Sequence, residues 1–176
     1  SHSKSPLIHS LFAKQTNQEM SYTAIPLEEG NFDGFVKSFF AEGGAGLNVT
    51  VPFKENAFAL AASCSPRAQL AKAVNTLFLD DQGNICGDNT DGIGLVTDIK
   101  QNNGVDLSGQ RLLILGAGGA VRGALAALVH EQVATITVVN RTLTKAKTLA
   151  DEFESMTAIE ALSYEALQDS ANHGRC

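Results

Sequence analysis

The amino-acid sequence predicts an α/β protein with two domains in one chain. Three observations support this prediction: several segments carry apolar residues at helical spacing, short apolar runs typical of strands alternate with them, and clusters of glycine, asparagine and aspartate separate the two kinds. A chain of 176 residues with 44% hydrophobic residues can bury the core of one large or two small domains. We expect an open α/β domain followed by a second, incomplete α/β domain.

Two segments near the start predict helices, with a strand between them. Ser3-Lys4-Ser5-Pro6 provides a capping serine and a proline for the first helical position, and apolar residues follow at helical spacing. Residues 21–25 resemble a short strand. Asn31 can cap a second helix, whose phenylalanines repeat at helical spacing between 32 and 40 and indicate a core face.

The start of the first helix is a candidate anion site. Free amides and the positive end of the helix dipole attract a carboxylate there, and the hydroxyls of Ser3 and Ser5 can add donors. Simple capping of the helix by a serine is the alternative interpretation.

The next segments predict a strand and a hairpin. Residues 47–51 alternate apolar with polar and stop at Pro52, which places Lys54 just beyond the carboxyl end of a strand, where open α/β sheets bind ligands. A solvated surface lysine is the alternative. Ser65-Pro66 repeats the capping signal, and residues 73–79, 80–84 and 85–87 then predict strand, turn and returning strand. Within the first of these strands Asn75 and Thr76 need hydrogen-bond partners, from backbone or from a ligand.

The hairpin leads into Gly87-Asp88-Asn89-Thr90-Asp91-Gly92, where we place the active site. A glycine-framed cluster of small polar residues and two carboxylates cannot be buried without partners, so we expect it to line a pocket between the two domains. A helical pattern from Ile93 to Asn102 follows and predicts the crossover between them.

The second domain opens with a βαβ unit. The strand Arg111–Leu115 meets the glycine turn Gly116-Ala117-Gly118-Gly119-Ala120, a helical pattern runs from Val121 to Val129, and a second strand spans 134–139. Such a turn lets backbone amides approach a pyrophosphate at a helix N-terminus, which predicts dinucleotide binding, with a purely structural turn as the alternative. The third glycine of the usual fingerprint is replaced by Val121.

The residues after the second strand indicate which dinucleotide binds. NAD sites usually carry an acidic residue there, whereas this chain has Asn140-Arg141-Thr142 with Lys145 close behind. Arginine and lysine suit a 2′-phosphate, so the sequence favours NADP. A solvated helix start is the alternative. A helix at 144–153, a strand at 157–161 and a short helix capped by Ser163 continue the βα pattern, which then ends unfinished.

We therefore divide the chain into a substrate-binding and catalytic domain at 1–92, a connecting helix at 93–105 and an incomplete Rossmann-type domain at 106–176. The beginning without methionine and the tail at 172–176 indicate a fragment.

Composition restricts the class of partner. A net charge of −6 and a pI near 5.1 argue against nucleic acid or an anionic membrane and favour a small soluble ligand. The three cysteines form no CxxC pair and suit a reducing cytoplasm, and no metal site is implied. The most apolar run, 112–129, is too interrupted to span a bilayer, and no signal peptide is visible.

Six motifs in order, taken together, resemble the shikimate dehydrogenase family over nearly the whole chain. They are Ser3-Lys4-Ser5-Pro6, Asn48-Val49-Thr50-Val51-Pro52-Phe53-Lys54, Ala73-Val74-Asn75-Thr76, Gly87-Asp88-Asn89-Thr90-Asp91-Gly92, Gly116-Ala117-Gly118-Gly119-Ala120 and Asn140-Arg141-Thr142. The resemblance implies reversible NADPH-dependent reduction of 3-dehydroshikimate to shikimate, in the route to aromatic amino acids. A homodimer is compatible with it.

The resemblance also implies a role for each matching position. The implied substrate-binding residues are Ser3 and Ser5 for the carboxylate, and Asn48, Thr50, Asn75 and Thr90. The implied catalytic pair is Lys54 and Asp91. The implied cofactor-binding residues are Gly116, Ala117, Gly118, Gly119, Ala120, Asn140, Arg141, Thr142 and Lys145.

The residue types suit the chemistry. When hydride reaches a ring ketone, its oxygen gains negative charge and needs a nearby cation and a proton, both of which Lys54 can provide. Asp91 can hold the ammonium and bind a neighbouring hydroxyl, and which of the two moves the proton stays open.

Compared with the family, the chain lacks an opening strand and the part that follows the third strand of the nucleotide domain, so we expect it to be inactive alone. Two alternatives remain: a quinate/shikimate dehydrogenase that accepts NAD, and a non-catalytic fragment that binds nucleotide or a partner.

Overall fold

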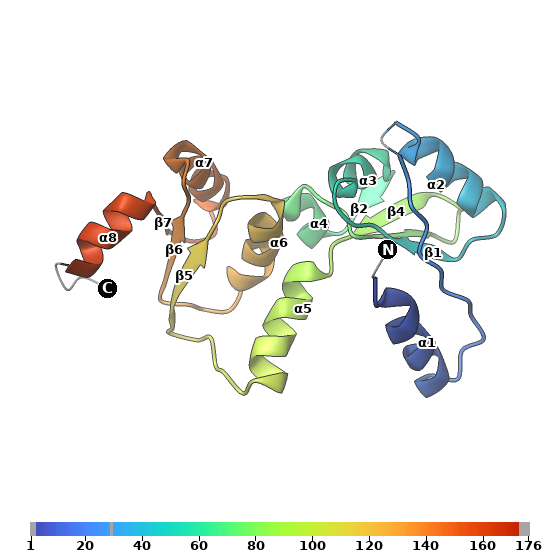
Figure 1. The fold of residues 1–176 in the computed structure, drawn as a ribbon, viewed down its shortest axis with the longest axis horizontal. Helices are drawn as coiled ribbons and strands as arrows, with labels where there is room; N and C mark the ends of the chain where they lie inside the picture. Colours follow the sequence, from blue (N-terminus) through green and yellow to red (C-terminus); the bar gives the residue numbers. More distant parts are fainter. Residues whose placement is uncertain (1–2, 29, 173–176) are drawn as a thin grey trace.

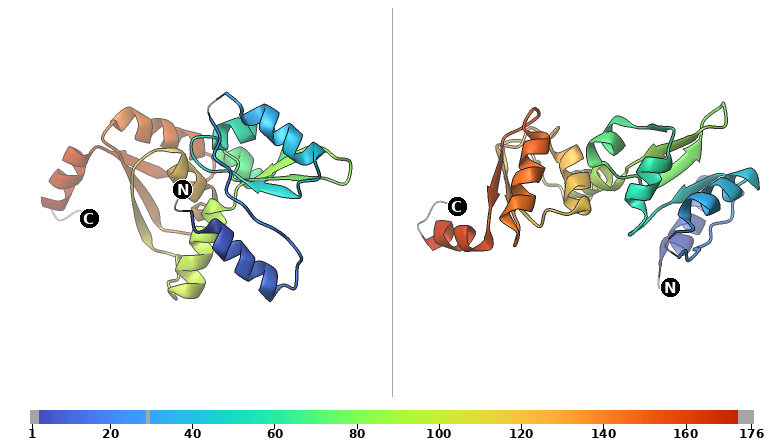
Figure 2. Two further views of the ribbon diagram at one scale, coloured as in Figure 1. Left: turned by 45° about the vertical axis from the view of Figure 1, so that its right-hand side comes forward. Right: turned by 90° about the horizontal axis from the view of Figure 1, so that it is seen from above.

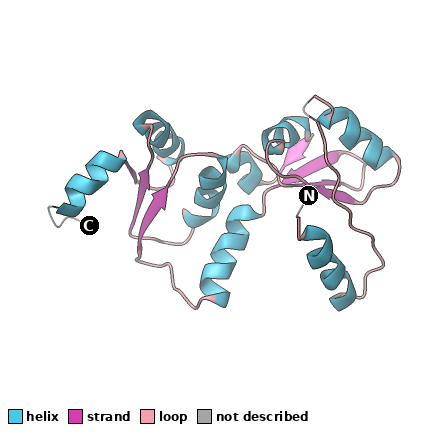
Figure 3. Ribbon diagram, viewed as in Figure 1, coloured by secondary structure: helices cyan, strands magenta, loops and turns pink. Residues whose placement is uncertain are grey.

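The computed structural model describes residues 3–28 and 30–172 and has an α/β fold built on two separate sheets. Its strands are β1 (Gly46–Asn48), β2 (Ser63–Cys64), β3 (Thr76–Leu79), β4 (Ile85–Asp88), β5 (Arg111–Leu115), β6 (Thr135–Val139) and β7 (Ile159–Leu162). Its helices are α1 (Ser5–Gln15), α2 (Phe32–Ala41), α3 (Lys54–Leu60), α4 (Pro66–Ala71), α5 (Asp91–Thr97), α6 (Gly119–Leu128), α7 (Leu143–Phe153) and α8 (Tyr164–Asn172). Figure 3 separates the two kinds of element by colour.

The first sheet, with the helices around it and α5, forms the N-terminal unit (residues 3–28 and 30–97). Its strand order is β1-β3-β4-β2, with β3 antiparallel to both β1 and β4, and β2 parallel to β4. Helices α2 and α3 lie on one face of the sheet and α1 on the other (Figure 1). The phenylalanine face of α2 packs with Val74 and Leu77 in the core, as its helical spacing predicted.

The second sheet defines the C-terminal unit (residues 107–172). Its three strands are parallel in the order β5-β6-β7, and α6 and α7 supply the crossovers. Leu112 and Ile114 of β5 face the core formed by Leu125 and Phe153, whereas Leu113 and Leu115 are 55% and 61% exposed. The predicted βαβ unit is therefore confirmed, with one face of β5 open in the described chain.

The two units meet where α5 and α6 pack closely, and they lie side by side along the long axis of the molecule (Figure 2). A methyl group added to Gly92 of α5 would lie 2.2 Å from the carbonyl oxygen of Gly123 in α6, so glycine permits this approach. After α5 the helix continues as one π-helical turn at Asp98–Asn102.

A shared ion pair also joins the units. The carboxylate of Glu152 on α7 lies 2.9 Å from Lys72 Nζ, just after α4, and 2.9 Å from Arg122 Nε on α6. Burial alone would raise the pKa of Glu152, but the hydrogen bonds from Lys72 and Arg122 outweigh burial and the pKa is lowered.

Several predicted boundaries are wrong. Residues 21–25 form no strand, because no neighbouring backbone pairs with them in a ladder. The strand predicted at 47–51 ends at Asn48, since residues 50–53 form a turn closed by the Phe53 amide on the Thr50 carbonyl. The strand predicted from 73 begins only at Thr76.

Three further local features differ from the sequence prediction. Helix α1 begins at Ser5, so Lys4 rather than Ser5 occupies the N-cap. Helix α3 and the two-residue strand β2 were not predicted, because neither segment is long enough to show a period. The limits proposed at 92 and 105 stay predictions, and the first of them falls inside α5.

Candidate active site

Lys54 and Asp91 meet although 37 residues separate them in the chain. Lys54 is the first residue of α3, directly after the turn that follows β1, and Asp91 is the first residue of α5. Their Nζ and Oδ2 atoms are 2.6 Å apart, and the side chains are 26% and 40% exposed. The pair is therefore formed by two helix starts and remains accessible to a ligand.

Asn75 holds the carboxylate side of this pair in place. Its side chain is 9% exposed, and its amide nitrogen donates to Asp91 Oδ1 at 2.8 Å and to Thr90 Oγ1 at 3.0 Å. Its amide oxygen accepts from the Thr90 backbone nitrogen at 3.0 Å and from the Thr76 hydroxyl at 2.9 Å. The structure thus joins four predicted site residues, Lys54, Asn75, Thr90 and Asp91, in one network.

The second carboxylate of the glycine-framed motif, that of Asp88, does not join the hydrogen-bond network around Lys54 and Asp91. Asp88 accepts from Arg67 Nε at 2.8 Å and makes a second contact with the other arm of that guanidinium. These bonds, with help from the Ser65 hydroxyl, hold the pKa of Asp88 below its usual value despite burial. The expectation that both carboxylates face a pocket is therefore corrected: Asp88 is an internal anchor between β4 and α4.

Asn89 lies in the motif where the sequence placed the active site, but the sequence prediction gave it no role of its own. It is 4% exposed, donates from its side chain to the Ala73 carbonyl at 3.0 Å and accepts from the Asp91 backbone nitrogen at 3.1 Å. It therefore fixes the backbone from which the Asp91 side chain projects. A small amide between two carboxylates at a strand end was the available signal.

The remaining predicted substrate residues lie around β1 and the start of α1. Ser3 Oγ accepts from the Ser5 backbone nitrogen at 3.3 Å, which is a local turn rather than a side-chain cap of the helix. Asn48 is exposed at the end of β1 and accepts from the hydroxyl of Tyr22 at 2.9 Å. Thr50 is exposed in the turn before Lys54. Tyr22 was not among the predicted site residues.

The glycine turn has the backbone shape that the sequence predicted. Gly116 has φ of +117°, a conformation that side chains disfavour, and its amide donates to the Val139 carbonyl at 2.7 Å. Added methyl groups on Gly118 and Gly119 would meet nothing within 4 Å, so the start of α6 is open. Its first-turn amides can therefore receive a phosphate.

The predicted phosphate-binding residues follow the neighbouring strand. Asn140 comes directly after β6 and donates from its side chain to the Thr142 carbonyl at 2.9 Å, while Arg141 and Lys145 are exposed. Because β5 and β6 are parallel neighbours, their carboxyl ends bring the glycine turn and Asn140 to the same edge of the sheet.

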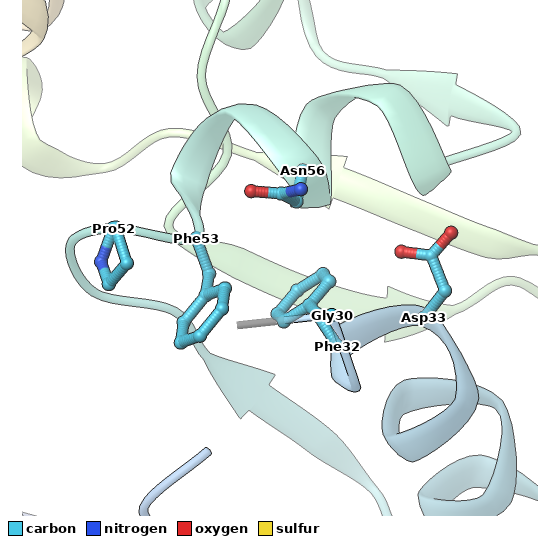
Figure 4. A pocket seen from close by; sticks show the side chains of 6 residues that line it. All are labelled: Gly30, Phe32, Asp33, Pro52, Phe53 and Asn56. Atoms are coloured by element: carbon cyan, nitrogen blue, oxygen red, sulfur yellow. The ribbon is translucent and has the colours of Figure 1, made fainter. Parts of the chain in front are cut away.

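An open hollow of about 600 Å³ borders the turn that precedes Lys54, through Pro52 and Phe53. Figure 4 shows its lining, in which the rings of Phe32 and Phe53 stack at a centroid distance of 5.2 Å. Lys54 and Asp91 do not line it, so this hollow is separate from the polar network.

Within residues 3–28 and 30–172, no three histidine, cysteine, aspartate or glutamate side chains gather as a metal site would require. In the same part of the chain, every helix is too short or too polar to cross a bilayer.

The fold and the two clusters define a class: a two-unit α/β protein with a βαβ unit of the kind that suits a nucleotide and a lysine–carboxylate pair in the other unit. Residues 1–77 match the family model described as the shikimate dehydrogenase substrate binding domain, and residues 98–173 match shikimate / quinate 5-dehydrogenase. The chain belongs to the shikimate dehydrogenase family.

Individual relatives agree with this assignment. The chain is 55% identical over 166 residues to shikimate dehydrogenase (NADP(+)) of Aeromonas salmonicida (strain A449), which covers 94% of this chain and 60% of that protein. An Ael1 enzyme from Pseudomonas putida superposes with a TM-score of 0.88 at 47% identity, covering 95% and 61% of the two chains. Shikimate 5-dehydrogenase from Listeria monocytogenes, solved with shikimate and NAD, gives 0.86 at 29% identity, covering 96% and 59%. The chain thus spans about 60% of the length of the relatives it matches.

Proposed function

We propose that this chain carries the substrate site and part of the NADP site of a shikimate dehydrogenase, which reversibly reduces 3-dehydroshikimate to shikimate with NADPH. The observation that carries the proposal is the Lys54–Asp91 pair at 2.6 Å, held by Asn75, in a chain that also contains the open glycine turn. Its relatives' names, which include NADP, support the same assignment.

The residues of the C-terminal unit fit a phosphorylated dinucleotide. The open amides at the start of α6 suit a pyrophosphate, and the exposed cations Arg141 and Lys145 suit a 2′-phosphate. NADPH, when bound, supplies the hydride for the ring ketone. The proposed cofactor-binding residues are Gly116 to Ala120, Asn140, Arg141, Thr142 and Lys145.

The residues of the N-terminal unit would bind and polarise the substrate. The ammonium of Lys54 stabilises negative charge that develops on the ketone oxygen. A proton shared between Lys54 Nζ and Asp91 Oδ2 can then pass to that oxygen to form the alcohol. Asn75 and Asn89 keep Asp91 in position for this role. The proposed substrate-binding residues are Ser3, Ser5, Asn48, Thr50, Asn75 and Thr90.

Calorimetric titration of the chain with shikimate and with NADP tests the proposal directly. We expect both to bind, because each cluster lies within this chain. Turnover is measured on a chimera. It joins this chain to the part of the Aeromonas salmonicida protein that the chain does not match. Binding of NADP without any binding of shikimate would instead support a nucleotide-binding fragment with no catalytic role.

A quinate/shikimate dehydrogenase that accepts NAD is a second candidate, because one matching family model includes quinate and the Listeria relative was solved with NAD. Arg141 and Lys145 favour NADP. Turnover of the chimera with shikimate against quinate, and with NADP against NAD, separates the two.

We further propose that the protein acts in the cytoplasm, in aromatic amino acid biosynthesis, which its cysteine usage and its proposed substrate support. The exposed Leu113 and Leu115 on the open face of β5 support association through this face, for which a homodimer is the simplest form. Sedimentation measures the assembly state.

A further inference from the structure

Tyr22 connects two of the proposed substrate residues. It lies in the irregular segment between α1 and α2, where its side chain is half-buried. Its hydroxyl donates to Asn48 Oδ1 at 2.9 Å, and the side chain of Ser5 lies close enough to the same phenol to lower its pKa. One phenol oxygen therefore links the start of α1 to the end of β1.

Tyr22 is also a main contact between α1 and the rest of the molecule. The ring of His9 on α1 stacks on the Tyr22 ring at a centroid distance of 4.1 Å and an interplanar angle of 3°. Ala13 is the buried residue of α1, whereas Leu7 and Phe12 are 63% and 53% exposed. Helix α1 lies across the sheet from α2 and α3 (Figure 1), so the Tyr22 ring is one of the groups that hold it against the rest of the unit.

The bond to Tyr22 determines which group Asn48 offers to a ligand. An asparagine side chain has one acceptor oxygen and one amide with two donors, and the oxygen of Asn48 is engaged by the phenol. The amide nitrogen of Asn48 is then the end that can reach a substrate hydroxyl. Loss of the phenol would remove the bond that fixes this orientation of the amide.

Protonation of Tyr22 supports the same arrangement. Burial raises the pKa of the phenol, and the nearby side chain of Ser5 lowers it only in part. The phenol therefore keeps its proton at neutral and mildly alkaline pH, and it continues to donate to Asn48 under ordinary assay conditions.

We propose that Tyr22 is a positioning residue for substrate binding, which sets Ser5 and Asn48 in one arrangement so that they contact two parts of the same ligand. The inference rests on the proposed function, since it assigns Ser5 to the carboxylate of shikimate and Asn48 to a hydroxyl. Tyr22 itself touches neither the reacting atoms nor the Lys54–Asp91 pair.

Tyr22→Phe tests the proposal, because it keeps the ring that stacks on His9 and removes only the hydroxyl. We expect calorimetry to show about five- to tenfold weaker binding of shikimate, the size of one lost hydrogen bond, and unchanged binding of NADP. Tyr164→Phe, the same change on α8, is the matched control and leaves both affinities unchanged. Equal shikimate affinity in wild type and Tyr22→Phe would overturn the proposal.

A double variant separates positioning from general stability. If Tyr22 acts through Asn48, then Tyr22→Phe adds little to the loss already caused by Asn48→Ala, whereas independent effects would add. Full additivity would contradict a positioning role.

NMR of the ligand-free protein gives a readout that does not depend on the proposed function. The two side-chain amide protons of Asn48 should give separate, sharp signals in wild type and broadened or shifted ones in Tyr22→Phe. If wild type fails to bind shikimate, the proposed function fails, and the Asn48 signals still decide whether Tyr22 orients that amide. Identical Asn48 signals in the two proteins would refute the inference.

Discussion

The two units of the molecule hold their candidate site residues in different ways. In the N-terminal unit, Lys54, Asn75, Thr90 and Asp91 are bonded to one another through their side chains. In the C-terminal unit, Arg141 and Lys145 are exposed, and the backbone at Gly116 sets the geometry instead. The comparison suggests a general division: side chains that do chemistry are held by neighbouring side chains, whereas a phosphate cradle needs only the right backbone and accessible cations.

The largest expected effect is on the N-terminal network. Lys54→Ala should lower turnover of the chimera about a thousandfold while shikimate affinity changes by less than about threefold, since the ammonium acts mainly on charge that develops during the reaction. Asp91→Asn should behave in the same way. Lys37→Ala, an exposed lysine on α2, is the control. Equal losses in turnover and affinity would mean that Lys54 and Asp91 only bind the substrate and take no part in catalysis.

The next effect concerns the C-terminal cations. Arg141→Ala should weaken NADP binding about 10- to 100-fold, which is the range for a lost charge-assisted hydrogen bond, and leave NAD binding nearly unchanged. Calorimetry with both nucleotides measures the difference. Arg111→Ala, at the opposite end of the adjacent strand, provides the control. A parallel loss for NAD would show that Arg141 does not recognise the 2′-phosphate.

The packing between the units can be tested by one methyl group. Gly92→Ala should destabilise the protein by about 1–3 kcal/mol, because the added carbon would lie 2.2 Å from the Gly123 carbonyl. Gly94→Ala in the same helix meets nothing within 4 Å and should be neutral or slightly stabilising. Urea unfolding of both variants measures the difference, and equal stabilities would argue against the close approach of α5 and α6.

The smallest effect concerns the internal anchor Asp88. Asp88→Asn should cost about 1 kcal/mol at neutral pH, whereas Asp81→Asn in the exposed hairpin turn should cost little. Because the pKa of Asp88 is lower in the folded protein than in the unfolded chain, its stabilisation is complete above the ordinary aspartate pKa and is lost as pH falls through the lowered value. Unfolding curves measured from neutral to acidic pH should therefore converge for wild type and variant. Curves that stay parallel would exclude this role.

The sequence predicted the C-terminal unit well because its signals are local. The strand at Arg111–Leu115 has the predicted bounds, and the glycine turn has the backbone conformation that only glycine readily adopts. Residues 21–25 were assigned wrongly because a strand needs a partner, and no local pattern reveals that the partner is absent.

The site was predictable only in part for the same reason. The convergence of Lys54 and Asp91 followed from the family resemblance, and the structure brings these two side chains together. The pairing of Arg67 with Asp88 depends on β2 lying parallel to β4, a two-residue contact without any periodic signal. Tyr22 comes from a segment with no regular structure, so its contact with Asn48 could be found only in three dimensions.

The carboxylate of Glu152 joins the two units through a salt bridge that ionic strength can weaken. Lys72 belongs to one unit, whereas Glu152 and Arg122 belong to the other, so a hinge motion between the units would stretch or break the Lys72–Glu152 contact. Dissolved salt screens such contacts, most strongly at the exposed lysine. Closure around a bound ligand should therefore be stiffer in dilute buffer than in concentrated salt.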